Sequence, residues 1–274
     1  IDGLPTELVV PGRRALEIAQ DRLNEKSFVS ELGATCAPYA RVDSEEELAR
    51  AVTTIGAPGI LKTARDGYDG KGQWRISSAH EAEGVRFPGR TCIYEGFVDF
   101  AAEFSVILVR GANGEVRFWD SSANVHDGGM LAVSTLPAGA LIESQVDAAR
   151  EIARQTANAL GYIGVLTLEF FATSNGPIFN EMAPRVHNSG HWTIEGAATS
   201  QFENHIRAVA GLPLGGTETR FASIEMRNIV GEDALTAHQI LAEEGEPHLH
   251  LYGKREANEG RKMGHVTRVS HKVD

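Results

Sequence analysis

Apolar residues return at helical spacing in four stretches of the chain. This spacing predicts helices at 12–32, 44–55, 147–160 and 200–210. The second has the clearest start, because Ser44 and Glu47 form a capping box in which each side chain can satisfy a main-chain donor of the first turn. The third has the clearest end, because Gly161 follows its last apolar position.

Most of the remaining apolar residues cluster or alternate in short runs between turn signals, as strands do. The predicted strands are 60–63, 74–76, 91–98, 103–110, 116–119, 165–171, 178–181, 249–253 and 264–269. Asn113-Gly114 favours a tight hairpin between two of them.

Composition narrows the class of protein. The 274 residues are 42% hydrophobic and 23% charged, with a net charge of −11, which argues against binding to nucleic acid or to an anionic membrane. Cys36 and Cys92 show no metal-binding spacing, and no apolar run approaches membrane-spanning length, so a cytoplasmic protein is expected. The first residue is Ile1, and we expect a longer or processed product.

The segment 180–192 is unusually rich in chemically active side chains. Its thirteen residues hold one acid, one guanidinium, two imidazoles and two amides, directly after a strand-like run. So many polar groups need partners if they are buried. We therefore interpret the segment as the floor of an active site, in which Arg185 and His187 could face one small anion. Asn188, Ser189 and His191 are expected to hold its shape.

A glycine-rich stretch at 65–73 lies between two predicted strands. Its three glycines let main-chain N–H groups approach an anion, but it lacks the sequence and the following helix of a Walker A loop. A flexible flap and an ordinary hairpin turn both fit, and the flanking Lys62 and Lys71 favour a flap over phosphate.

The register of the hairpin at 165–181 decides whether two acids meet. A three-residue loop, 174–176, places Glu169 opposite Glu181 on one face, whereas a two-residue loop, 175–176, places them on opposite faces. Facing carboxylates favour Mg²⁺ between them. Alternatively, Glu169 faces an arginine or shares a proton with Glu181.

From their positions alone, three further residues are not expected to take part in a site. Arg22 and Lys26 lie one turn apart on a predicted helix and fit a solvated face, and His126 lies in a polar stretch and fits a loop. The flap, the acid pair and the basic loop together predict ATP-dependent phosphoryl transfer to an anion.

Three segments resemble the ATP-grasp ligases, and more narrowly the N5-carboxyaminoimidazole ribonucleotide synthetases, the ATPase subunits of phosphoribosylaminoimidazole carboxylase. They are 67–74, 95–98 and 180–193, the last of which is the most specific. The resemblance runs from about Gln20 to about Val269. It implies that ATP and bicarbonate form carboxyphosphate, whose carboxyl group passes to aminoimidazole ribonucleotide, giving ADP and phosphate in purine biosynthesis.

The resemblance also implies site residues, and it reverses the modest reading of Arg22 and His126. ATP contacts are implied at Arg22, Lys62, Gly67, Tyr68, Asp69, Gly70, Lys71, Gly72, Gln73, Glu95, Gly96, Phe97, Val98, Glu103, His126, Asn180 and Glu181. Catalytic roles are implied for Tyr68, Lys71, Arg185 and His187, substrate contacts for Lys254, Arg261 and Arg185, and metal ligands at Glu169 and Glu181. The implied cofactors are ATP and Mg²⁺, with Mn²⁺ as a substitute, and a homodimer is expected.

The implied fold is of the α+β class, the ATP-grasp fold, in which two α/β subdomains clasp the nucleotide. We expect a linker and first helix at 1–24, the ATP-grasp domain at 25–211 with a flap subdomain at about 57–98, and a truncated β-rich subdomain at 212–274. We expect the family's N-terminal domain to have no counterpart within these 274 residues, and Lys71 stands where an arginine is common in the family. Two other functions stay open: a biotin carboxylase-like ligase, and an ATP-binding module inactive without that domain.

Overall fold

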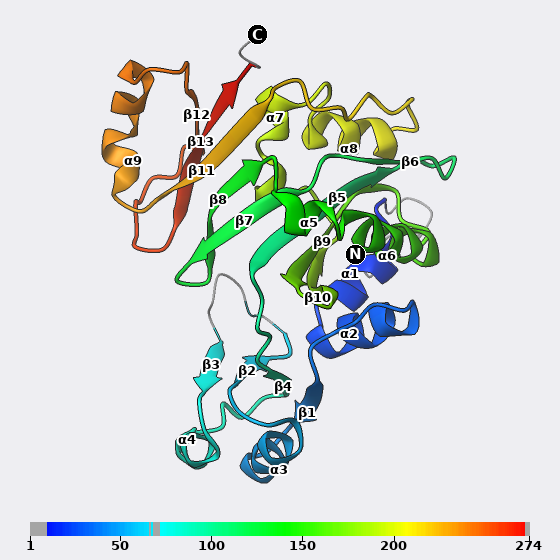
Figure 1. Cartoon of the computed structure of the whole chain (residues 1–274), viewed down its shortest axis with the longest axis vertical. Coiled ribbons are helices and arrows are strands. Elements are labelled where there is room, and N and C mark those ends of the chain that lie inside the picture. The colour runs from blue at the N-terminus through cyan, green and yellow to red at the C-terminus, as the bar shows by residue number, and fades with distance from the viewer. Residues whose placement is uncertain (1–9, 66, 68–71, 272–274) are drawn as a thin grey trace.

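The computed structural model describes residues 10–65, 67 and 72–271, which form two sheets with helices packed on them. The four-stranded sheet has the order β1 (Tyr39–Val42), β4 (Cys92–Gly96), β2 (Gly59–Thr63), β3 (Gln73–Ile76). It lies with α3 (Glu45–Ile55) and α4 (Ala79–Gly84) at one end of the molecule, while the C-terminus lies at the other (Figure 1).

The small sheet packs on its helices through a compact apolar core that includes Val42, Leu48, Leu61 and Tyr94. The predicted capping box is present in a shifted form. Ser44 Oγ accepts from the main-chain N–H of Glu47 at 3.2 Å, but the Glu47 carboxylate accepts from the main chain of the residue before Ser44 at 2.7 Å. Both bonds occupy main-chain donors where the chain enters α3.

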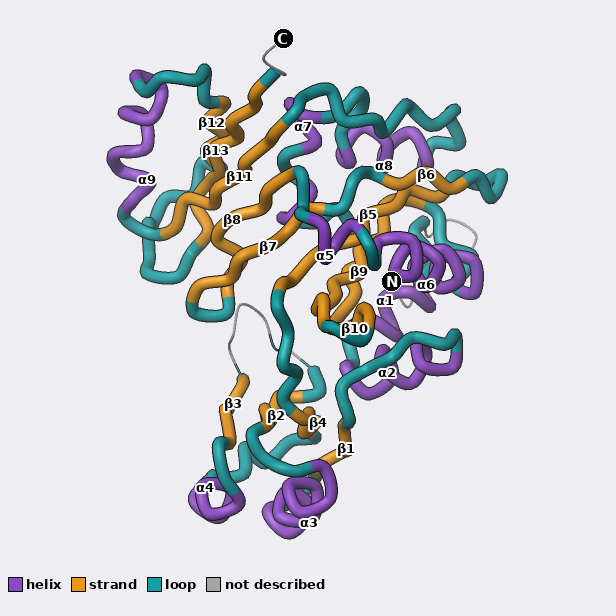
Figure 2. The backbone as a smooth tube through the Cα atoms, viewed as in Figure 1, coloured by secondary structure: helices purple, strands orange, loops and turns teal. Residues whose placement is uncertain are grey.

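The large sheet supplies the platform of the molecule (Figure 2). Its strands run in the order β10 (Gly176–Ala183), β9 (Gly164–Thr173), β5 (Ala102–Arg110), β7 (Ser122–Asp127), β8 (Met130–Leu136), β11 (Ser223–Val230), β13 (Lys262–Ser270), β12 (His248–Leu251), and β6 (Val116–Phe118) pairs with β5. The hairpin predicted at Asn113-Gly114 is present between β5 and β6, with Arg110 opposite Val116.

Alternation along β5 divides the core into two layers. Phe104, Val106 and Leu108 face α1 (Arg13–Ala19), α2 (Arg22–Glu31) and α6 (Val146–Ala159), the predicted amphipathic helix. Ile107 and Val109 face the layer that contains α8 (Gln201–Val209). Shorter helical elements are α5 (Ala140–Glu143), η2 (Asn188–Gly190), α7 (Thr193–Gly196), α9 (Asp233–Thr236) and η3 (Ala237–Ala242).

The single helix predicted at 12–32 is wrong, because the chain forms two helices there. Asp21 has an extended backbone between them, and its Oδ1 accepts from the main-chain N–H groups of Leu23 and Asn24 at 3.1 and 3.3 Å. An aspartate N-cap starts a new helix. As a consequence, Arg22 is the first residue of α2 and lies at its end instead of in the middle of a longer helix.

The C-terminal strands extend the large sheet and do not form a sheet of their own. β11 pairs with β8, where Met226 lies opposite Ser134, and β13 continues from β11 to β12. The predicted boundary at 212 is therefore not marked by a separate sheet, and the domain limits stay a prediction. His126, read from its position as a loop residue, lies in strand β7. Within the described residues, we find no helix long and apolar enough to span a membrane.

Candidate functional site

The two predicted acids face each other on the β9–β10 hairpin. The turn is shorter than predicted, because Gly176 already pairs with Thr173. A bulge at Asn180 then inserts one extra residue into β10, so that Glu181 lies opposite Glu169. The predicted pairing is confirmed, but the three-residue loop behind it is wrong, since the bulge supplies the missing residue.

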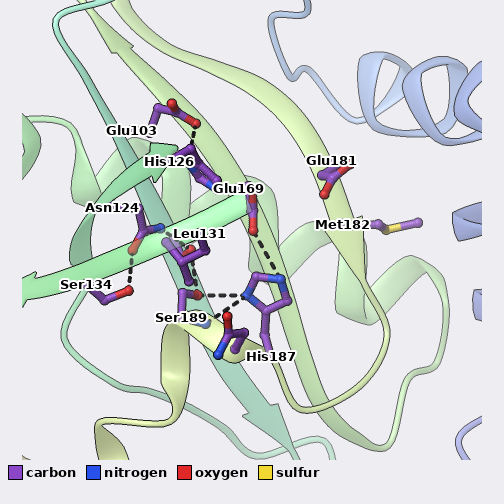
Figure 3. A network of polar contacts seen from close by, with 12 residues as sticks. Glu103, Asn124, His126, Leu131, Ser134, Glu169, Glu181, Met182, His187 and Ser189 are labelled. Atoms are coloured by element: carbon purple, nitrogen blue, oxygen red, sulfur yellow. Dashed lines mark hydrogen bonds and ion pairs between the residues drawn. The ribbon is translucent and has the colours of Figure 1, made fainter. Parts of the chain in front are cut away.

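Each acid of this pair has a different neighbour. Glu181 Oε2 lies 3.0 Å from the Arg22 guanidinium, and its side chain keeps 41% exposure. Desolvation opposes ionisation of Glu181, but the charge and hydrogen bond of Arg22 and the other nearby positive charges together outweigh it, so the pKa of Glu181 is lowered. Burial, followed by the charge of Glu181, raises the pKa of Glu169. His187 lies on the far side, with Nε2 3.1 Å from Glu169 Oε1 (Figure 3).

A buried cluster of two lysines and one glutamate lies beside the acid pair. Lys62 Nζ and Lys26 Nζ are 3.1 and 3.3 Å from the same Glu95 oxygen, and Lys26 also donates to the main-chain carbonyl of Asn180 at 3.2 Å. The solvated face predicted for Arg22 and Lys26 is therefore wrong, since their side chains are 13% and 1% exposed. Burial, despite Glu95, lowers the pKa of Lys62.

A carboxylate–imidazole contact joins two neighbouring strands of the large sheet at this site. His126 Nδ1 on β7 lies 3.0 Å from Glu103 Oε2 on β5. Burial lowers the pKa of His126, but Glu103 and the other acids outweigh it, so the net pKa is raised. This pair extends the row of polar groups along the platform (Figure 3).

Short hydrogen bonds hold the loop after β10. Gln201, the first residue of α8, accepts from the main-chain N–H of His187 at 2.9 Å and donates to its carbonyl at 2.6 Å. The side-chain amides of Asn188 and Asn228 bond reciprocally at 2.6 and 2.9 Å. Burial, with the nearby charge of Arg185, lowers the pKa of His187 to about 3, so its ring is neutral at pH 7.

The basic pair predicted to bind substrate lies on the connection between β12 and β13. Lys254 Nζ donates to the main-chain carbonyl of Lys262 at 2.6 Å, and Arg261 donates to that of Glu256 at 3.3 Å; both side chains are exposed. The charge of Lys262 partly offsets the rise in the pKa of Glu169 that burial and Glu181 cause, and it adds to the burial that lowers the pKa of His187. Sequence reasoning missed Lys262, because no motif distinguishes it from its basic neighbours.

The predicted flap is described only at its ends. Tyr68, Asp69, Gly70 and Lys71 lie outside the described residues. Gly72 has φ of +70°, its carbonyl accepts from the main-chain N–H of Thr63 at 2.9 Å, and a Cβ there would lie 2.8 Å from Thr63 Oγ1. Glycine is thus required at this position.

The predicted hinge, 95–98, consists of the last two residues of β4 and the two residues after it. Phe97 donates its main-chain N–H to the carbonyl of Pro58 at 3.0 Å, which ties the end of β4 to the start of β2. Gly96 also donates its N–H, to the carbonyl of Pro38 at 2.8 Å. Gly67 and Gln73 of the predicted flap and Val98 of the predicted hinge also lie in the described part of the chain.

Comparison with known families decides what this arrangement belongs to. Residues 27–202 match the ATP-grasp domain, and residues 225–274 match the phosphoribosylaminoimidazole carboxylase C-terminal domain. A Brucella melitensis protein named N5-carboxyaminoimidazole ribonucleotide synthase is 49% identical over 269 residues, covering 96% of this chain and 74% of that protein. The chain belongs to the N5-carboxyaminoimidazole ribonucleotide synthase family of ATP-grasp ligases.

Solved structures of this synthase family have the same fold. The synthetase from Thermus thermophilus is 46% identical, with a TM-score of 0.88 over 96% of this chain and 71% of that one. The synthase from Aspergillus clavatus, solved in complex with ADP and 5-aminoimidazole ribonucleotide, is 29% identical, with a TM-score of 0.87 over 96% and 72%. The predicted ATP-grasp α+β fold is confirmed.

Proposed function

We propose that this ATP-binding ligase carboxylates 5-aminoimidazole ribonucleotide with bicarbonate, through carboxyphosphate, to give N5-carboxyaminoimidazole ribonucleotide, ADP and phosphate. Family membership supports the reaction, and the crystallised Aspergillus clavatus relative holds ADP and 5-aminoimidazole ribonucleotide. The observation that carries the proposal is one row of side chains, in which Arg22, Glu181, Glu169 and His187 follow one another. Such a row offers a nucleotide site at one end and an anion site at the other.

The nucleotide end has the charges that a triphosphate needs. Arg22, Lys26 and Lys62 bring three cations to the edge of the acid pair, and the two lysines share one Glu95 oxygen. The other Glu95 oxygen is buried without a hydrogen-bond partner among the described residues, which leaves an acceptor for a ligand. We assign Arg22 and Lys62 to the phosphates, and Glu103 with His126 to the ribose. Positioning and neutralisation of charge then do most of the catalysis.

Glu169 and Glu181 fit Mg²⁺. They are facing carboxylates, and Mg²⁺ commonly uses one or two carboxylates together with substrate phosphates. Within the described residues, no group of three or more metal-binding side chains surrounds them, which suits an ion completed by nucleotide oxygens and water. When bound, the ion neutralises phosphate charge. Burial, followed by the charge of Glu181, raises the pKa of Glu169, and a cation bound between the two carboxylates would oppose both effects.

The anion end lies on the loop held by Gln201. We assign Arg185 and His187 to bicarbonate and carboxyphosphate. The Arg185 guanidinium supplies a positive charge. The neutral imidazole of His187 can donate a hydrogen bond without adding a second positive charge. Lys254 and Arg261 are exposed and available for the phosphate of the nucleotide substrate. Tyr68 and Lys71 keep their proposed catalytic roles from the resemblance, and a homodimer remains part of the proposal.

The test is ADP release from ATP by the 274-residue chain, with bicarbonate and 5-aminoimidazole ribonucleotide added separately and together. We expect release to require bicarbonate and to rise with the nucleotide, with its carboxylated product detected in equal amount. Release that is indifferent to the nucleotide would contradict the proposal and favour a biotin carboxylase-like ligase. Turnover seen only in a longer version of the protein would favour an ATP-binding module. Light scattering of the same sample measures whether it is a dimer.

A further inference from the structure

A chain of buried hydroxyl and amide groups runs from the middle of the large sheet to His187. His187 Nδ1 lies 2.8 Å from Ser189 Oγ, which lies 2.8 Å from Ser105 Oγ. Asn124 Nδ2 donates to Ser105 Oγ at 2.7 Å, and Ser134 Oγ donates to Asn124 Oδ1 at 2.8 Å. Figure 3 shows His187 between Ser189 and Glu169, with Asn124 at the other end.

The members of this chain come from four separate elements. Asn124 lies on β7, Ser134 on β8, Ser105 on β5 and Ser189 on the short helix η2. Their exposed fractions are 6% for Asn124 and 0% for the three serines. Buried polar groups must be satisfied, and a half-satisfied network is costly, so the protons of this chain have to be arranged consistently.

One main-chain bond fixes the first proton. The backbone N–H of Ser189 donates to His187 Nδ1 at 3.3 Å, and a backbone N–H can only donate. Nδ1 is therefore an acceptor, and the proton of the neutral ring lies on Nε2. Ser189 Oγ, 2.8 Å from the same nitrogen, must then donate its hydroxyl proton to it.

The remaining protons follow in order. Because Ser189 uses its proton on His187, the proton shared by the two serine hydroxyls must come from Ser105, and either hydroxyl can rotate to donate. Ser105 Oγ in turn accepts from the Asn124 amide, whose oxygen accepts from Ser134 and, at 3.1 Å, from Ser122. One direction of donation satisfies every member.

We propose that Asn124 is a positioning residue which, acting through Ser105 and Ser189, holds His187 in the tautomer that carries its proton on Nε2. That nitrogen is the one 3.1 Å from Glu169 Oε1, at the acid pair. His187 thus presents a donor to the site and cannot take a proton there as a neutral ring. The consequence for catalysis rests on the proposed function, in which a donor suits an anionic carboxyl group.

The variant that tests this is Asn124→Asp, which keeps the size of the side chain and replaces its donor by an acceptor. With the new carboxyl group ionised, Ser105 donates to it, Ser189 donates to Ser105, and Ser189 Oγ can only accept from Nδ1 of His187. For His187, the ratio of rings with a proton on Nδ1 (imidazolium included) to neutral rings with a proton only on Nε2 should therefore be about tenfold higher, or more, than in the wild type. While protonated, the carboxyl group donates as the amide does, so spectra are recorded from about pH 6 to about pH 9.

The measurement is the ¹⁵N spectrum of the imidazole rings in the 274-residue chain, with the His187 signals assigned by their loss in His187→Gln. Asn204→Asp is the matched control: Asn204 is also buried, but its side chain bonds the main chain of Gly215. We expect no change of the His187 tautomer there. Adding Ser105→Ala to Asn124→Asp cuts the relay and should restore the Nε2–H form, which a merely structural effect would not do.

The outcomes separate the two proposals. A wild-type His187 with its proton on Nδ1 would overturn the inference, and this measurement needs no variant to fold. An unchanged tautomer in ionised Asn124→Asp would also overturn it. For Asn124→Asp, we expect the kcat for carboxylation to be lower than that of the wild type by about tenfold or more. Its KM for ATP should stay within about twofold of the wild-type value. A changed tautomer with unchanged carboxylation supports the positioning role and contradicts the role proposed for His187.

Discussion

Glu25 should make the stability of this protein fall with rising pH. It lies on α2, its side chain is 2% exposed, and its Oε1 accepts from the main-chain N–H of Met182 at 2.6 Å. Burial, followed by the charge of Glu181, raises the pKa of Glu25 from 4.5 to about 8. The folded chain therefore holds this proton more tightly than the unfolded chain does, and folding is favoured while the proton stays bound.

The magnitude follows from the two pKa values of Glu25. Between about pH 4.5 and about pH 8 the unfolded carboxyl group is ionised and the folded one is not, so the stability falls by about 1.4 kcal/mol for each pH unit. The loss approaches an upper limit of about 5 kcal/mol, which is a large part of the 5–15 kcal/mol, roughly, that stabilises a domain. Glu25→Gln removes the titration, and its amide oxygen can still accept from Met182.

The assay is urea unfolding of the wild type and of Glu25→Gln at several pH values. All other titrating groups are shared, so the difference between the two free energies of unfolding isolates Glu25. We expect this difference to grow in favour of the variant as the pH rises towards 8. Glu31→Gln, at an exposed position of the same helix, should show no such trend. A Glu25→Gln difference that does not change with pH would refute the reasoning.

Three further substitutions test the site and the fold. Glu181→Gln should lower Mg²⁺-dependent ADP release about a hundredfold with little change in the urea midpoint, and near-normal turnover would refute the paired-ligand assignment. Lys254→Ala should raise the KM for aminoimidazole ribonucleotide about tenfold at nearly constant kcat; an unchanged KM in initial-rate assays speaks against its phosphate contact. Gly59→Ala places a Cβ 2.2 Å from the Tyr94 hydroxyl and should cost about 1–3 kcal/mol in urea unfolding, whereas Gly12→Ala, with nothing within 4 Å, should not.

Local patterns predicted most of the elements of this fold. The Asn113-Gly114 hairpin and the capped helix after Ser44 follow from rules that involve only neighbouring residues. The break at Asp21 also obeys such a rule, but the helical spacing on either side of it masks the cap. The join between β8 and β11 could not be predicted, because strand pairing over about ninety residues leaves no local signal.

The site was predictable where one motif contains it and unpredictable where distant elements build it. From the sequence alone, Lys26 fits a solvated helix face. In the structure it forms an ion pair with Glu95, which lies on β4 of the four-stranded sheet. Likewise, Ser105, Ser134 and Asn124 behind His187 are ordinary strand residues, and only the pairing of β5, β7 and β8 brings them together. Charges and hydrogen bonds between distant segments therefore define this site more than its most recognisable sequence does.

The bulge at Asn180 shows why the acid pair was predicted from an incorrect loop. A two-residue turn alone would have left Glu181 out of register with Glu169, and the extra residue in β10 restores the pairing. The bulge also points the Asn180 carbonyl at the ammonium group of Lys26, 3.2 Å away. One inserted residue thus sets the face of the acid and anchors a lysine of the nucleotide end. An irregularity that serves both the acid pair and the nucleotide end is part of the construction of the site, and alternation along the strand cannot reveal it.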